Sequence, residues 1–163
     1  MLKTAASRRI SALTLAFIRP SSTMSVCFAP GSDADALQPA VASLLPPAGG
    51  RWQLTAEGRA LQRTFSFKTF AKAWDFMTAV ALQAKIHSHH PEWSNVYNTT
   101  VVRWTTHNPR GLSDKDVRLA VICDSIAADF QEIDANEPAG GTANELLAKV
   151  VSNAGDCCTK KKV

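Results

Sequence analysis

The stretch that decides the fold spans residues 70–107 and is FAKAWDFMTAVALQAKIHSHHPEWSNVYNTTVVRWTTH. Its first half places apolar side chains at helical spacing and predicts a long helix that ends near Ile86. These apolar residues are Phe70, Ala73, Trp74, Met77, Val80, Ala81 and Ala84. Pro91 forces His90 toward extended geometry, so residues 87–90 form a turn at the end of that helix. The β-branched and aromatic residues that follow predict a hairpin of strands 93–97 and 99–106.

The segments before residue 70 and after residue 107 predict the remaining elements of the fold. Residues 52–55 and 60–67 predict a second hairpin that turns at Glu57-Gly58. Asp33 or Asp35 opens an earlier helix that runs to about Leu45; since Pro39 fits only a first turn, we expect the regular helix to begin near residues 36–38. Ser113 and Asp116 form a capping box for a final helix whose apolar face is Leu119, Ile122, Cys123, Ile126 and Phe130.

This order of elements predicts the fold class. Helix, two strands, helix, two strands and helix indicate a two-layer α+β fold, in which a four-stranded antiparallel sheet carries helices on one face.

The composition fits one globular domain with extensions. The chain has 163 residues, of which 45% are hydrophobic and 20% charged, and its net charge is +4. Lys3, Arg8, Arg9 and Arg19 account for the excess, because the remaining 14 basic residues equal the 14 acidic ones. We therefore expect no nucleic-acid partner. The apolar stretch 10–18 is also far shorter than the roughly 20 residues of a membrane helix, so we expect no membrane span.

The N-terminal segment contains no acidic residue before Asp33. A helix there would carry one apolar stripe with arginines beside it, which predicts that residues 1–30 are a mitochondrial transit peptide. The alternative is a cytoplasmic protein translated from Met24. We expect the domain at residues 31–131, followed over 132–163 by a polar linker, a short helix capped by Thr142, and a Lys-rich tail with Cys157-Cys158.

All four histidines, His87, His89, His90 and His107, fall within 21 consecutive residues. Histidine titrates near physiological pH, so such a group can supply a proton donor and a proton acceptor. We therefore expect an acid–base site with no metal and no cofactor. One alternative is a metal site made by His87, His89 or His90, and His107, but only Glu92 lies close in sequence as a further ligand. Another is a purely structural cluster.

Several motifs of this chain resemble the pterin-4a-carbinolamine dehydratase family, from about Asp33 to Phe130. The matching segments are FMTAVALQA at 76–84, HHPEW at 89–93, NVYN at 95–98, TH at 106–107, and GLS at 111–113 followed by Asp116. The resemblance implies a metal-free enzyme that dehydrates 4a-hydroxytetrahydrobiopterin to the quinonoid dihydropterin during tetrahydrobiopterin recycling, beside an aromatic amino acid hydroxylase. It also implies a homodimer or a homotetramer in which sheets join across subunits.

The resemblance assigns His89, His90 and His107 to catalysis, with the principal acid–base role at His90. The other two orient the hydroxyl or share the proton transfer. The substrate-binding residues it implies are Trp52, Trp93, Thr106 and Asp116. Trp52 is expected to stack on or wall the flat pterin ring, unless it is a plain core residue. From the residues themselves, Trp93 and Trp74 are expected to have packing roles, which leaves two roles open for Trp93.

The run Lys85-Ile86-His87-Ser88 departs from the family pattern, which often has acidic residues before His-His-Pro. His87 is additional to that pattern, and we expect it to face solvent; the alternative is that it replaces the missing carboxylate. A fold can outlast its activity. The alternative function is therefore a catalytically weak homologue that acts as a protein-binding or dimerisation module.

Overall fold

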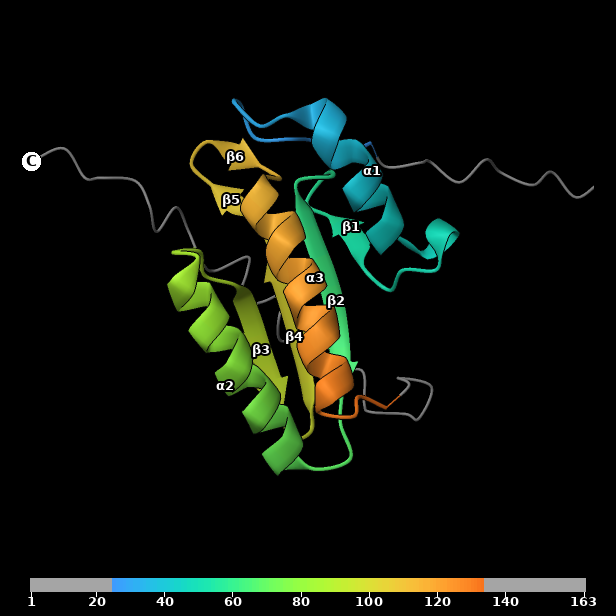
Figure 1. The fold of residues 1–163 in the computed structure, drawn as a ribbon, viewed down its shortest axis with the longest axis vertical. Helices are drawn as coiled ribbons and strands as arrows, with labels where there is room; N and C mark the ends of the chain where they lie inside the picture. Colours follow the sequence, from blue (N-terminus) through green and yellow to red (C-terminus); the bar gives the residue numbers. More distant parts are fainter. Residues whose placement is uncertain (1–24, 134–163) are drawn as a thin grey trace, which may run out of the picture.

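A computed structural model describes residues 25–133 of the chain (Figure 1). Helix α1 spans Ala34–Leu44, α2 spans Phe70–Ile86 and α3 spans Asp114–Asp129, and a short 3-10 helix, η1, spans Pro46–Ala48. The strands are β1 (Gln53–Thr55), β2 (Ala60–Ser66), β3 (Glu92–Val96), β4 (Thr99–Trp104), β5 (Thr106–His107) and β6 (Arg110–Gly111).

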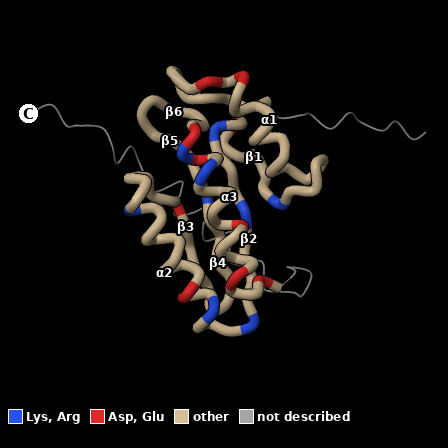
Figure 2. The backbone as a smooth tube through the Cα atoms, in the orientation of Figure 1, with Lys and Arg blue, Asp and Glu red and all other residues tan. Residues whose placement is uncertain are grey.

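The main sheet has the strand order β1-β2-β4-β3, and every neighbouring pair is antiparallel. Helices α2 and α3 lie across one face of it, and α1 packs beside α3 (Figure 1). The predicted two-layer α+β fold is therefore confirmed. Acidic and basic residues are interspersed along the described chain (Figure 2). Within residues 25–133, no helix is both long and apolar enough to cross a membrane.

The core lies between the sheet and these helices. Alternation along β2 and β4 turns Leu61, Phe65, Val102 and Trp104 toward the helices, where all four are fully buried. The Phe65 ring meets Phe76 of α2 with centroids 4.7 Å apart. Burying a large apolar side chain contributes about 1.5–3 kcal/mol, so this layer dominates the stability of the domain.

Helix α2 ends in a Schellman motif that fixes the chain entering β3. The backbone N–H of His89 donates to the Ala84 carbonyl (3.0 Å) and that of Ser88 donates to the Lys85 carbonyl (3.2 Å). Ser88 has a φ of 47°, a left-handed conformation that usually selects glycine. The two hydrogen bonds set where His89 and His90 leave the helix.

Two predicted boundaries were wrong. Helix α1 begins at Ala34 rather than near residues 36–38, because Asp33 caps it by accepting from the Ala36 N–H (3.0 Å), and the helix continues through Pro39. The last strand ends at Trp104 rather than at residue 106. Residues 106–107 pair instead with Arg110–Gly111 in a small separate hairpin.

The domain also extends beyond the expected residues 31–131. Cys27 N–H donates to the Gly58 carbonyl and Ala29 N–H to the Leu112 carbonyl, both at 2.9 Å. Gly111 is required at this crossing, since a Cβ there would lie 2.3 Å from the Ala29 nitrogen. The expected transit peptide therefore overlaps the folded domain at residues 25–30.

At the other end of the domain, Ile133 N–H donates to the Ser66 carbonyl (2.8 Å), so the expected linker does not begin at residue 132. The rest of the predicted transit peptide, the helix capped by Thr142 and the Cys157-Cys158 pair lie outside the described residues.

Candidate active site

The end of α2, the start of β3, the β5 strand and the first turn of α3 meet at one end of the sheet. His89 lies deepest there, with Nε2 2.6 Å from Asp116 Oδ1. Its ring stacks on Trp104, with centroids 5.7 Å apart and planes 20° apart. These two contacts hold the imidazole from both its edge and its face.

Asp116 is fully buried and is the centre of the hydrogen bonds around His89. Its Oδ2 accepts from the Thr106 hydroxyl (2.7 Å), from the Ser113 N–H (2.8 Å) and from the Ser113 hydroxyl (3.0 Å). The predicted capping box is confirmed. Asp116 and Thr106, which were expected to bind substrate, here position His89, and Asp116 has no surface free for a ligand.

His107 has a carboxylate of its own. Its Nε2 lies 3.3 Å from Glu92 Oε1, and the other oxygen of Glu92 forms an ion pair with Arg103 Nε at 2.6 Å. The antiparallel register of β3 and β4 places Glu92 directly opposite Arg103. Glu92 is therefore held by the sheet, and it fixes the side of the site that His107 occupies.

His90 lies between these two pairs. Its ring is 5.5 Å from that of His107 and 6.5 Å from that of His89, and the planes are within 30° of each other in both cases. Its side chain is exposed, and its Nδ1 lies 3.4 Å from the Pro91 carbonyl oxygen. Within residues 25–133 it has no carboxylate partner. The site is thus a row of three imidazoles, of which the middle one is exposed and lacks a carboxylate partner among residues 25–133.

A cavity of about 430 Å³ adjoins this row. It is lined by Ala81, Ala84, Lys85, Ser88, His89, His90, Pro91 and Trp93. Small-molecule sites typically have such a volume and combine apolar walls with a few polar groups. The cavity brings Trp93 together with His89 and His90, as a substrate-binding role for Trp93 requires.

Trp52 lies elsewhere. It is fully buried, its ring packs against Phe65, and its indole N–H donates to Asp124 (2.8 Å). Asp124 is eight residues beyond Asp116 on α3, about 12 Å along the helix. The structure therefore gives Trp52 the core role that was the alternative to ring stacking.

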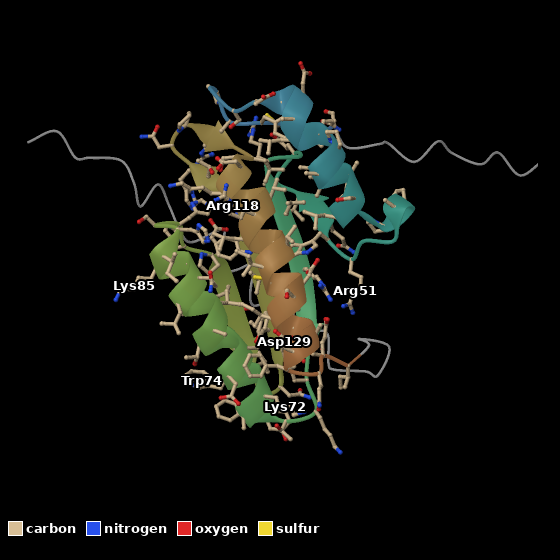
Figure 3. The ribbon with its side chains drawn as sticks, viewed as in Figure 1. Arg51, Lys72, Trp74, Lys85, Arg118 and Asp129 are labelled. Atoms are coloured by element: carbon tan, nitrogen blue, oxygen red, sulfur yellow. The ribbon has the colours of Figure 1, made fainter. Side chains whose placement is uncertain are left out.

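Trp74 departs from its predicted packing role. It is 51% exposed, and it contacts Phe70 on the outer side of α2 (Figure 3). His87 is the C-cap residue of α2 and is partly exposed. Within the described residues, no three His, Cys, Asp or Glu side chains are grouped to hold a metal ion, so nothing in the geometry favours the alternative metal site.

Lys85 and Ser88 were not predicted as site residues, although the sequence carries a signal for them. Positions 81, 84, 85 and 88 lie on one helical face, and this face continues from the core toward the histidines. Arg103 was also missed. Its contact with Glu92 depends on the register of β3 and β4, which the sequence alone does not specify.

Comparisons with known proteins agree with this geometry. Residues 32–126 match the pterin 4 alpha carbinolamine dehydratase family. Two relatives that bear the name of this dehydratase are from Novosphingobium aromaticivorans (46% identical over 86 residues, 53% of this chain and 85% of the relative) and Prochlorococcus marinus (52% over 66 residues, 40% and 69%).

Among solved structures, the chain is similar to one described as a transcriptional coactivator/pterin dehydratase from Brucella melitensis. The identity is 36% and the TM-score 0.50, and the match covers 57% of this chain and 94% of the other. The sequence match, the fold and the row of histidines lead to one conclusion: this chain belongs to the pterin 4 alpha carbinolamine dehydratase family.

Proposed function

We propose that the protein dehydrates a 4a-hydroxytetrahydropterin, and the expected substrate is 4a-hydroxytetrahydrobiopterin. The observation that carries the proposal is the exposed imidazole of His90, which stands between two imidazoles that each have a carboxylate. Such a row can deliver and accept protons at neighbouring atoms of one bound ring. The adjoining cavity supplies a binding volume for that ring.

The reaction needs two proton transfers. The C4a–O bond breaks with its electron pair on oxygen, and a proton from an acid makes the departing hydroxyl water. The N5–H proton passes to a base, and its electron pair forms the N5=C4a double bond. The acid and the base are both restored when a proton returns from one to the other, so histidines alone meet the requirement.

The three histidines divide this work by their partners. His90, which has no carboxylate partner within the described chain, exchanges protons with the substrate. The carboxylates of Asp116 and Glu92 lie 2.6 and 3.3 Å from Nε2 of His89 and His107, and these contacts hold both rings in position. Those two rings orient the hydroxyl and return protons to His90.

The test is dehydration of 4a-hydroxytetrahydropterin by the purified protein, measured above the spontaneous rate. Because a positioned acid–base group typically contributes about 10² to 10⁴-fold, His90→Ala should lower the rate by a factor in that range. His87→Ala is the matched control and should change the rate far less, since its ring is outside the row. A larger loss from His87→Ala, reversed by added metal, would favour the metal site.

A second candidate function rests on the outer side of α2. Phe70, Trp74, Leu82 and Ile86 are each between 46% and 69% exposed there, an unusual density of large apolar side chains for one helix. The surface supports a protein-binding or dimerisation role, including the homodimer or homotetramer expected for the family. An absence of dehydration by well-folded protein, together with self-association in sedimentation experiments, would favour this role over the enzyme.

The functional link to an aromatic amino acid hydroxylase follows from the same proposal, because a hydroxylase of that class produces the carbinolamine. Delivery to mitochondria is proposed from the sequence of residues 1–30, which has four basic residues, no acidic one and the spacing of an apolar helical stripe.

A further inference from the structure

We infer that Lys85, with Ser88 beside it, forms a subsite for an anionic group, a carboxylate or a phosphate, carried by the substituent of the bound pterin. The inference rests on the proposed dehydration of a 4a-hydroxytetrahydropterin and changes one part of it: the preferred pterin carries an anionic C6 substituent, whereas the C6 substituent of biopterin is uncharged.

The first observation is the place of Lys85 on α2. Ala81 and Ala84 form the apolar part of the helix face that lines the cavity, and Lys85 and Ser88 continue this face at its end. The Lys85 side chain is exposed and extends away from the helix (Figure 3). Within residues 25–133 its ammonium group has no ion-pair partner. It is therefore a cation at the rim of the cavity with its charge available.

The second observation is the charge of the surroundings. None of the eight residues that line the cavity is acidic. The neighbouring carboxylates are already engaged, Asp116 by His89 and Glu92 by Arg103 and His107. An anion at the rim would therefore meet one free ammonium group and no free carboxylate.

The third observation is that carbonyls near the end of α2 are partly occupied, which reduces their repulsion of an anion. A helix C-terminus normally repels anions through its unpaired carbonyls. Here the carbonyls of Gln83, Ala84 and Lys85 accept from the N–H groups of His87, His89 and Ser88 respectively. The hydroxyl of Ser88 adds a neutral hydrogen-bond donor next to Lys85.

The chemistry of the ring brings its substituent to this rim. N5 of a tetrahydropterin is bonded both to the reacting carbon C4a and to C6, which carries the substituent. When C4a and N5 face the exposed His90, a C6 substituent leaves the ring on the same open side of the cavity. A carboxylate or a phosphate on that substituent then comes within reach of a flexible lysine side chain.

The experiment compares two fluorescent pterins that differ in charge at this position, 6-carboxypterin and 6-hydroxymethylpterin. Their dissociation constants are measured for the wild-type chain, Lys85→Ala, Lys85→Glu and Lys68→Glu. Lys68→Glu makes the same change of net charge at an exposed position near the opposite end of α2. Unfolding curves of each variant are measured on the same samples.

We expect the wild type to prefer 6-carboxypterin. Because exposed ion pairs contribute about 0.2–1 kcal/mol, Lys85→Ala should weaken that ligand by about threefold and Lys85→Glu by about tenfold. Binding of 6-hydroxymethylpterin should stay within about twofold, and the preference should shrink at high salt. Lys68→Glu should leave both constants unchanged.

Three results would overturn the inference while the dehydratase assignment survives: equal binding of the two pterins by the wild type, equal weakening of both by the Lys85 variants, or the same loss from Lys68→Glu. Failure of the well-folded wild type to bind either pterin would instead overturn the proposed function, and this inference with it.

Discussion

Asp116 shows how one residue can serve the fold and the site together. Its two oxygens join the N-cap of α3, the β5 strand and His89, and none of it reaches solvent. A buried carboxylate is stable only when its lone pairs are occupied, and here four donors can occupy them. The same hydrogen bonds that begin the helix therefore orient the imidazole.

Asp116→Asn should weaken both functions of the residue. An amide cannot accept at both ends, so at least one buried donor loses its partner, and we expect the free energy of unfolding in urea to fall by about 1–3 kcal/mol. The dehydration rate per folded molecule should fall as well, because His89 loses the group that orients it. Asp114→Asn is the control, since Asp114 lies in the same helical turn but is exposed; an equal effect from that change would contradict this role for Asp116.

At the scale of the element, α2 and α3 end in the same way. Each closes with a Schellman motif whose left-handed residue is not glycine: Ser88 in α2, with a φ of 47°, and Gln131 in α3, with a φ of 61°. The motif of α2 delivers His89 and His90, and that of α3 delivers Glu132 and Ile133 to β2. In both cases a cap turns the chain toward a long-range contact.

Ser88→Gly should stabilise the protein. A left-handed residue with a side chain costs roughly 1–2 kcal/mol and glycine avoids this cost, although glycine loses more chain entropy on folding. The expected net gain is about 0.5–1 kcal/mol in the free energy of unfolding. Ser88→Ala removes the same hydroxyl and keeps the conformational cost, so it should give no gain. A comparable gain from alanine would show that the backbone conformation is not the cause.

For the whole molecule, a charged network joins the segment before β1 and the chain after α3 to the sheet. Arg63 of β2 forms ion pairs with Asp124 of α3 and with Glu132, and Arg51 reaches Glu132 at 2.6 Å. Only 6% of the Glu132 side chain is exposed. Its burial raises the pKa of Glu132 above the ordinary value of 4.5, against the opposing effect of both arginines. The network thus binds the chain beyond α3 to the sheet, although burial disfavours the charged form of Glu132.

This pKa shift gives stability a definite pH dependence. A carboxyl group whose pKa is raised by folding binds protons more tightly in the folded state, so its contribution is largest at low pH and is lost as pH rises through the raised pKa. Relative to Glu132→Gln, the wild type should therefore lose free energy of unfolding as pH rises from about 4 upward. Urea titrations of both proteins across this range measure the two free energies of unfolding. An increase in the stability of the wild type relative to Glu132→Gln as pH rises would contradict the prediction.

The sequence by itself determined the local elements and marked the histidines of the candidate site. Helical spacing over residues 70–86, Pro91 after the paired histidines and the Ser113-Asp116 capping box are short-range signals, and each element formed where they indicated. The four clustered histidines marked the place of the candidate site for the same reason, since three of them lie within one turn of the chain.

The tertiary structure alone decided which groups meet. Asp116 pairs with His89 across 27 residues, and Trp52 donates to Asp124 across 72. Such contacts depend on the strand order and on how the helices pack against the sheet. Neither can be predicted from residues that are close in sequence. For this reason Trp52 looked like a ligand-binding residue and proved to be core, whereas Lys85 and Glu92 gained their places at the site only when α2, β3 and β4 came together.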